Sequence, residues 1–79
     1  MHTFVKVRVN VDFKERQKIA HKLYLVRTQL GITQVMLQKE GIISQSHLSK
    51  IENAEINVSA IMLHALAKRY GKEMSFFFE

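Results

Sequence analysis

The sequence predicts a mainly α-helical fold of four to five short helices, preceded by one N-terminal β-strand. Apolar residues recur at spacings of three and four over several stretches, and Ser, Thr and Gly punctuate those stretches as helix boundaries do. Near the N-terminus, Val instead alternates with polar residues, which favours a strand. At 79 residues the chain is one small unit, which we divide into a strand or arm (1–11) and a helical domain (12–79).

The N-terminal strand is predicted from the alternation over Thr3–Val11. Every second residue from Val5 to Val11 would share one face, and the polar residues between them would share the other. A single strand leaves its own backbone hydrogen bonds unmade. We therefore expect it to pair with a second copy of the chain, with Ser75–Glu79, or with another part of a longer protein.

The first helix is expected to begin at Asp12, which is a suitable N-cap, with Glu15 three residues later as in a capping box. Gly31 is its expected stop. An apolar stripe at helical spacing lies between these boundaries and consists of Ile19, Leu23, Val26 and Leu30.

A short second helix is predicted from Gln34 to about Lys39, with Thr33 as its N-cap. Val35 and Leu37 are its residues available for burial. The segment Gly41–Ile43 follows as a turn.

The third helix is predicted from Gln45 to about Asn53, with Ser44 as its N-cap and with Leu48 and Ile51 facing the core. Two short helices joined by such a turn form a helix-turn-helix, which here would run from Thr33 to Asn53.

A fourth helix is predicted over Ala60–Tyr70, between Ser59 as N-cap and Gly71 as stop. Its inward residues would be Leu63, Leu66 and Ala67. One further turn is expected over Ser75–Phe78.

The outward face of the third helix has the chemistry of a DNA-reading surface. Gln forms paired hydrogen bonds with adenine, Lys reaches guanine or phosphate, and Ser hydroxyls bond either bases or phosphates. Gln34, in the first turn of the preceding helix, is placed where backbone N–H groups attract phosphate. The residues left facing outward on the third helix are Gln45, Ser46, His47, Ser49 and Lys50.

The stretch from Leu23 to Gly71 resembles the lambda-repressor/Cro-type (XRE) helix-turn-helix DNA-binding family. The resemblance covers about 50 residues and rests on the joint spacing of its elements. Those elements are Leu23, Arg27, Gly31, Thr33-Gln34 and Leu37, then Ser44 and Leu48-Ser49-Lys50-Ile51-Glu52, then Ser59, Leu66-Ala67 and Gly71.

The resemblance implies roles for individual residues. Arg27 would pair with Glu52 as a structural ion pair. Phosphate contacts would come from Gln34 and Asn53, to which Ser44 and Ser49 are added as hydroxyls on the same surface. Base contacts would come from Gln45, Ser46, His47 and Lys50, with His47 as readily lying against Gln34 or in solvent.

Three positions depart from the family pattern. Gln38 stands where a small Ala is usual, and Gly41 comes one residue before the usual turn glycine, where this chain has Ile42. We therefore expect the second helix to end early and the turn to be longer. Ala54 stands where a glycine usually follows the third helix, so we expect Asn53 to take the left-handed conformation instead.

The charge favours a polyanionic partner. The formal net charge is +5 and the pI is about 9.8. The excess lies in residues 1–22, where it would give non-specific phosphate attraction or a solvated face. The basic residues there are Lys6, Arg8, Lys14, Arg16, Lys18 and Lys22, against Asp12 and Glu15.

Other function classes find little support. The chain has no cysteine, and its four histidines lack the spacing of a zinc site, so we expect neither a metal nor a cofactor. No apolar run reaches the about 20 residues needed to cross a bilayer, and there is no signal-peptide pattern, so we expect a cytoplasmic protein. We find no nucleophile with a paired base, which argues against an enzyme.

The sequence therefore predicts a double-stranded DNA-binding protein, a prokaryotic or phage transcriptional regulator. The alternative is a protein-interaction module, such as an antitoxin or an adaptor, on the same fold. A homodimer is expected in either case, through Thr3–Val11 strands or through the C-terminal Phe76–Phe78 segment.

Overall fold

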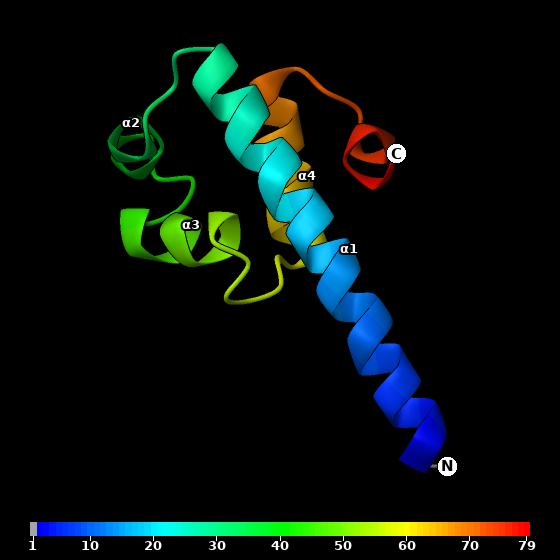
Figure 1. Ribbon diagram of the computed structural model, residues 1–79. Coiled ribbons are helices and arrows are strands. Elements are labelled where there is room, and N and C mark those ends of the chain that lie inside the picture. Colours follow the sequence, from blue (N-terminus) through cyan, green and yellow to red (C-terminus); the bar gives the residue numbers. More distant parts are fainter. Residues whose placement is uncertain (1) are drawn as a thin grey trace.

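The computed structural model describes the backbone of residues 2–79 and the side chains from Phe13 onward. Figure 1 shows a long first helix with two short helices on one side of it and the C-terminal segment on the other. The mainly α fold class is confirmed. In chain order the elements are α1 (His2–Gln29), α2 (Gln34–Lys39), α3 (Gln45–Glu52), α4 (Ala60–Tyr70) and the 3₁₀ segment η1 (Met74–Phe78).

The expected strand over Thr3–Val11 is wrong, because α1 already begins at His2. A lone strand would leave a row of backbone N–H and C=O groups unpaired, whereas a helix pairs them within the segment. The valines oppose a helix only weakly, by under about 0.7 kcal/mol each. No other strand is present in the part of the chain that the structure describes, so the helix is the conformation that satisfies this backbone.

The expected helix start at Asp12 is also wrong. Asp12 and Glu15 lie within α1, which runs without a break through the position where the domain boundary was expected. The division into an arm (1–11) and a domain (12–79) concerns whether the two segments fold independently, and it stays a prediction.

The starts of the three later helices are as predicted. The hydroxyl oxygen of Thr33 accepts a hydrogen bond from the backbone N–H of Met36 at 3.0 Å. The hydroxyls of Ser44 and Ser59 do the same for the third residue of α3 and of α4, both at 3.1 Å. Each cap satisfies one backbone donor that has no partner inside its helix.

All four helices end with the same pair of backbone hydrogen bonds, in which two consecutive residues at the helix end donate back into the last turn. This motif requires a positive φ at the first of those two residues. Glycine provides it after α1, α2 and α4, but after α3 the residue is Ala54, with φ of 60°. The expectation that Asn53 would be left-handed is therefore wrong, since Asn53 has φ of −88°.

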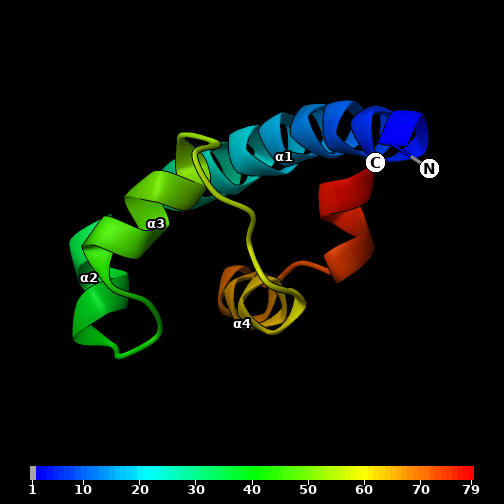
Figure 2. The ribbon, with the colours of Figure 1, turned by 90° about the horizontal axis from the view of Figure 1, so that it is seen from below.

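The core gathers side chains from every element, with the largest share from α4. The fully buried residues include Leu23 of α1, Leu37 of α2 and Leu48 of α3. Ile51 of α3, Leu66 of α4 and Phe77 of η1 belong to the same set, as expected for a domain in which each amphipathic helix buries one face. Figure 2 shows how the elements surround the core. α4 lies between η1 and the α2–α3 pair, and α1 runs past all of them.

Two residues expected to be buried are exposed. Leu30 is 51% exposed, because Gly31 turns the chain away directly after it and leaves no element to cover its side chain. Val35 is 40% exposed, because α2 is under two turns long and presents Leu37 to the core instead.

Segment η1 is held against α1 by two lysines one helical turn apart. The Nζ of Lys22 donates to the carbonyl oxygens of Phe76 and Glu79, at 2.9 and 2.6 Å. The Nζ of Lys18 donates to the carbonyl oxygen of Phe78 at 2.9 Å. These bonds satisfy carbonyl groups at the end of a helical turn, where cations are favoured.

Among the helices of the described residues, none combines the length and the apolar character needed to span a bilayer.

Candidate nucleic-acid interface

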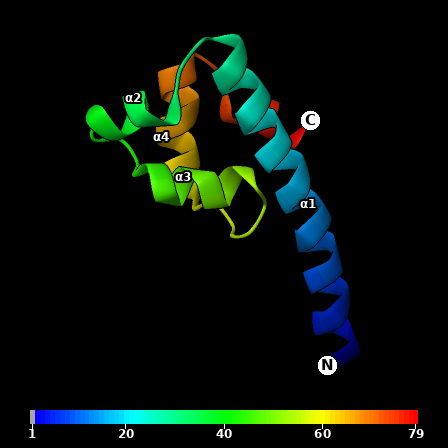
Figure 3. The ribbon, with the colours of Figure 1, turned by 60° about the vertical axis from the view of Figure 1, so that its left-hand side comes forward.

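The two helices of the expected helix-turn-helix lie beside each other on the same side of α1 (Figure 3). α2 has the expected bounds, Gln34–Lys39, and α3 (Gln45–Glu52) ends one residue before the expected Asn53. Leu48 and Ile51 anchor α3 to the core with exposures of 0% and 2%. This anchoring decides which face of α3 is left for solvent.

The exposed face of α3 is polar and basic. It contains the four side chains for which base contacts were predicted, and all four are exposed: Gln45, Ser46, His47 and Lys50. They stand on one continuous helical surface at the open side of α3. None of the four forms a side-chain hydrogen bond within the described residues, so their donors and acceptors point into solvent.

The expected phosphate-contacting residues occupy the edges of this face. Ser44 is exposed and its hydroxyl is already used as the N-cap of α3. Ser49 is half-buried, and its hydroxyl accepts a long hydrogen bond of 3.4 Å from the amide of Asn53. Ser44 therefore stands at the beginning of α3, and the Ser49–Asn53 pair at its end.

Arg27 and Glu52, the ion pair implied by the resemblance, lie against each other and join α1 to α3. The Nε and Nη2 atoms of Arg27 donate to the two carboxylate oxygens of Glu52, at 2.6 and 2.8 Å. The Nη1 atom donates to the carbonyl oxygen of Ile32 at 2.8 Å. The hydrogen bond to Glu52 raises the pKa of Arg27 above its ordinary value, against the opposing effect of burial.

Gln34 is drawn into the same cluster. Its Nε2 donates to Glu52 at 3.0 Å, so the carboxylate of Glu52 fixes residues from both α1 and α2. The side chain of Gln34 is half-buried and its amide oxygen has no partner among the described residues. The predicted approach of Gln34 to phosphate would therefore use an already oriented side chain.

Gln38 has a role that the sequence did not reveal. Its Oε1 accepts a hydrogen bond of 2.7 Å from the backbone N–H of Gln45, the first residue of α3. The side chain that replaces the usual Ala therefore ties α2 to the start of α3. The only sequence signal was the departure itself, since nothing local connects residues seven positions apart across a turn.

Two further contacts were also missed. Glu40, directly after α2, accepts two hydrogen bonds from Arg69 of α4 at 2.7 and 2.9 Å. Lys18 and Lys22, which we had placed in a basic region for phosphate attraction, are instead engaged with η1. Both contacts join residues far apart in the sequence, for which a single sequence gives no pairing signal.

No group of three or more potential metal-binding His, Asp or Glu side chains occurs within the described part of the chain. Comparison with protein families matches residues 23–77 to the family described as helix-turn-helix. The matched region contains α2, α3, α4, nearly all of η1 and the last turns of α1. Comparison with curated proteins and with solved structures gave no match.

Proposed function

The chain belongs to the lambda-repressor/Cro-type (XRE) helix-turn-helix family, whose members are DNA-binding regulators, and from this premise we propose that it binds double-stranded DNA sequence-specifically. The proposal extends to a prokaryotic or phage transcriptional regulator. In this proposal α3 enters the major groove, and α2 lies across the backbone beside it.

One observation carries the proposal. α3 buries Leu48 and Ile51 completely, yet leaves Gln45, Ser46 and Lys50 exposed together on its opposite side. A solvated helix face needs no rigid support. This one is supported at its start by Gln38 and at its end by Glu52, as a surface that must present side chains in fixed positions would be.

We assign base reading to Gln45, Ser46 and Lys50, with His47 as a further contact at the same edge. Gln and Lys suit adenine and guanine respectively. The phosphate contacts that set the register belong to the residues around this face, namely Gln34, Ser44, Ser49 and Asn53.

The experiment that tests the proposal is selection of bound sites from random duplex DNA, followed by titration of the selected site at several salt concentrations. We expect log affinity to fall linearly with log salt, with a slope set by the number of phosphates neutralised. Absence of binding at low salt would contradict the proposal and favour the protein-interaction alternative.

Two variants test the face assignment. Lys50→Ala is expected to weaken binding to the selected site and to relax preference at one base position, by about 1–3 kcal/mol of discrimination. Lys72→Ala is the matched control, because Lys72 is also exposed but follows α4 and lies over the ring of Phe76. Equal losses in both variants would show that Lys50 contributes only charge.

We also propose a homodimer, through the C-terminal segment. The alternative dimer interface, a ribbon of paired Thr3–Val11 strands, is ruled out because this segment is helical. Phe77 is fully buried and Phe76 is packed against the core, which leaves Phe78, at 50% exposure, as the aromatic ring available to a partner. Sedimentation of the parent chain and of Phe78→Ser tests this, and a dimer unchanged in Phe78→Ser would contradict this interface.

A further inference from the structure

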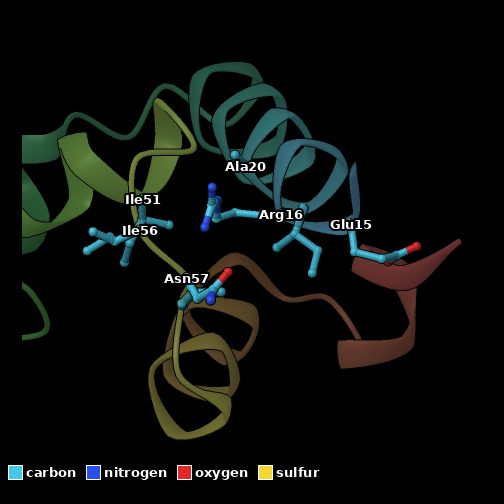
Figure 4. Close-up of a pocket in the computed structure, with 8 residues that line it drawn as sticks. Glu15, Arg16, Ala20, Ile51, Ile56 and Asn57 are labelled. Carbon is cyan, nitrogen blue, oxygen red and sulfur yellow. The ribbon is translucent and has the colours of Figure 1, made fainter. Parts of the chain in front are cut away.

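A pocket of about 270 Å³ lies between α1 and the loop that joins α3 to α4 (Figure 4). Arg16 and Ile19 line it from α1, Ile51 from the last turn of α3, and Ile56 and Asn57 from the loop. It is separate from the exposed face of α3, since none of the residues assigned to DNA contact lines it.

The guanidinium of Arg16 enters this pocket, and among the described side chains it forms no ion pair with an acid. Its Nε is buried and has no hydrogen-bond partner among the described residues. The ring of Phe13 lies 5.2 Å from the guanidinium carbon and covers it without accepting a hydrogen bond of ordinary strength. Figure 4 shows the carboxylate of Glu15 pointing away from the Arg16 nitrogens.

Buried donors in folded proteins nearly always have an acceptor, so an unsatisfied guanidinium Nε calls for a physical explanation. The planar donor set of Arg matches a carboxylate, which accepts two parallel hydrogen bonds. We propose that this pocket binds a small monocarboxylic acid, whose carboxylate pairs with Arg16.

The remaining walls define the rest of the ligand. Ile19, Ile51 and Ile56 supply apolar surface. The amide of Asn57 faces the guanidinium, whereas Glu15, the acid that also lines the pocket, directs its carboxylate away from it. Drug-sized ligands occupy pockets of about 300–1,000 Å³, so this pocket suits a single ring or a short alkyl chain. A polyanion such as a nucleotide does not fit, because its further charges would meet isoleucine side chains.

The position of the pocket gives the bound acid a consequence for α3. Ile51 belongs both to the pocket and to the buried anchor of the DNA-reading helix. An occupant that shifts Ile51 changes the placement of α3, so the acid acts as an effector. This consequence rests on the proposed DNA binding, whereas the binding of the acid does not.

The test is titration of the full chain with benzoate, followed by NMR chemical shifts of the backbone amides and without DNA present. We expect saturable shifts at Ile51, Ile56 and Asn57. Benzamide, which has the same ring and no charge, is expected to bind about tenfold or more weakly, because the charge-assisted hydrogen bonds are lost. Absence of saturable shifts, or equal binding of the two compounds, would overturn the proposal.

Three variants test whether the carboxylate of the bound acid pairs with Arg16. Arg16→Met removes the guanidinium and is expected to lose discrimination between benzoate and benzamide. Lys14→Met lowers the net charge equally on the same helix, but Lys14 is exposed and does not line the pocket, so its discrimination should remain. Asp12→Asn removes the acid one helical turn before Arg16 and should bind benzoate at least as tightly as the parent chain. Unchanged discrimination in Arg16→Met, or weaker binding in Asp12→Asn, would contradict the site.

The effector role is tested separately, by titrating the selected DNA site with and without saturating benzoate. We expect the DNA affinity to change by about fivefold or more, as in ordinary coupling between two sites. Benzoate binding without any change in DNA affinity would overturn the effector role alone. Benzoate binding by a chain that binds no DNA would refute the proposed function and leave the pocket assignment standing.

Discussion

Two arginine–glutamate pairs in this domain have nearly the same geometry and very different surroundings. The inner pair, Arg27–Glu52, has hydrogen bonds of 2.6 and 2.8 Å, and the outer pair, Arg69–Glu40, has hydrogen bonds of 2.7 and 2.9 Å. The side chains of the inner pair are 9% and 3% exposed, whereas those of the outer pair are 34% and 36% exposed. Hydrogen-bond geometry alone therefore does not show which pair contributes more to the stability of the fold.

Their surroundings do rank them. The inner pair also forms hydrogen bonds with the carbonyl oxygen of Ile32 and the amide of Gln34. Removal of one partner therefore leaves several buried polar groups without a hydrogen-bond partner. Water replaces either partner of the outer pair at little cost. The comparison shows that burial and additional bonds, rather than the ion-pair contact itself, decide which pair the fold depends on.

Breaking the inner pair is expected to have the largest effect. Glu52→Ala leaves the guanidinium of Arg27 buried without its acid, which costs about 3–5 kcal/mol of unfolding free energy. A domain at the lower end of the ordinary range of stability, about 5 kcal/mol, would be left close to unfolded at room temperature. Urea denaturation followed by circular dichroism measures the loss, and a change under about 1 kcal/mol would place the inner pair in the same class as the outer one.

The pKa of Tyr70 depends on charged residues of both ion pairs, so its titration tests their electrostatic effect. Burial and the charge of Glu52 raise the pKa of its phenol to about 12 from 10.0, while Arg27 and Arg69 oppose that shift. Between these two pH values the unfolded chain releases the phenol proton and the native protein keeps it. The native protein therefore binds more protons, and stability falls as pH rises, by roughly 2 kcal/mol over this window.

Denaturation at pH 9, 10, 11 and about 12 measures this dependence on pH, in the range of the cited shift. Tyr70→Phe should flatten it, and should not destabilise the protein at neutral pH, because the phenol oxygen has no hydrogen-bond partner within the described residues. Tyr24→Phe, at a 47% exposed ring, is the control and should keep the full dependence. An unchanged alkaline loss in Tyr70→Phe would show that another group causes it.

Glu40 and Glu52, the acids of the two pairs, lie at the ends of α2 and α3, and these two helix ends differ in the residue that has a positive φ. Glu40 is followed directly by Gly41, with φ of 76°, whereas the end of α3 uses Ala54, with φ of 60°. A left-handed conformation costs a non-glycine residue about 1–2 kcal/mol, and the greater flexibility of glycine when unfolded offsets part of that cost. We expect Ala54→Gly to raise the unfolding free energy by about 0.5–1 kcal/mol. A loss of stability would mean that the methyl group of Ala54 contributes packing that outweighs its strain.

Breaking the outer pair is expected to have the smallest effect. The hydrogen bond from Arg69 lowers the pKa of the Glu40 carboxyl, but both groups are open to solvent. Glu40→Ala should leave the denaturation curve superimposable on that of the parent chain in moderate salt, where exposed charges are screened. A measurable destabilisation that persists in high salt would show that the outer pair has a packing role.

The parts of the fold predicted from sequence were those with local causes. Thr33, Ser44 and Ser59 are the N-caps of α2, α3 and α4, because a hydroxyl beside an apolar helical pattern meets its donor three residues later. The glycines that end helices are recognisable for the same reason. The resemblance added the Arg27–Glu52 contact, which joins residues 25 positions apart.

The features that the sequence did not predict depend on residues far apart in the sequence, or on a second strand that the described residues do not contain. The alternating valines before Asp12 predicted a strand, but a strand requires a second strand and a helix does not. The hydrogen bond from Gln45 to Gln38 depends on the angle between two helices. Arg16 could not be distinguished from an ordinary surface cation until the α3–α4 loop was seen to pack beside it.

The hydrogen bonds of Lys18 and Lys22 have a practical consequence for experiments on this molecule. They hold η1 apart from α2 and α3, with α4 between them, as Figure 2 shows. A fluorophore or a surface tether attached through the side chain of Glu79, which is exposed, would therefore stand clear of the α3 face. Binding can be followed on an immobilised chain in one orientation, with every copy presenting the same helix to the solution.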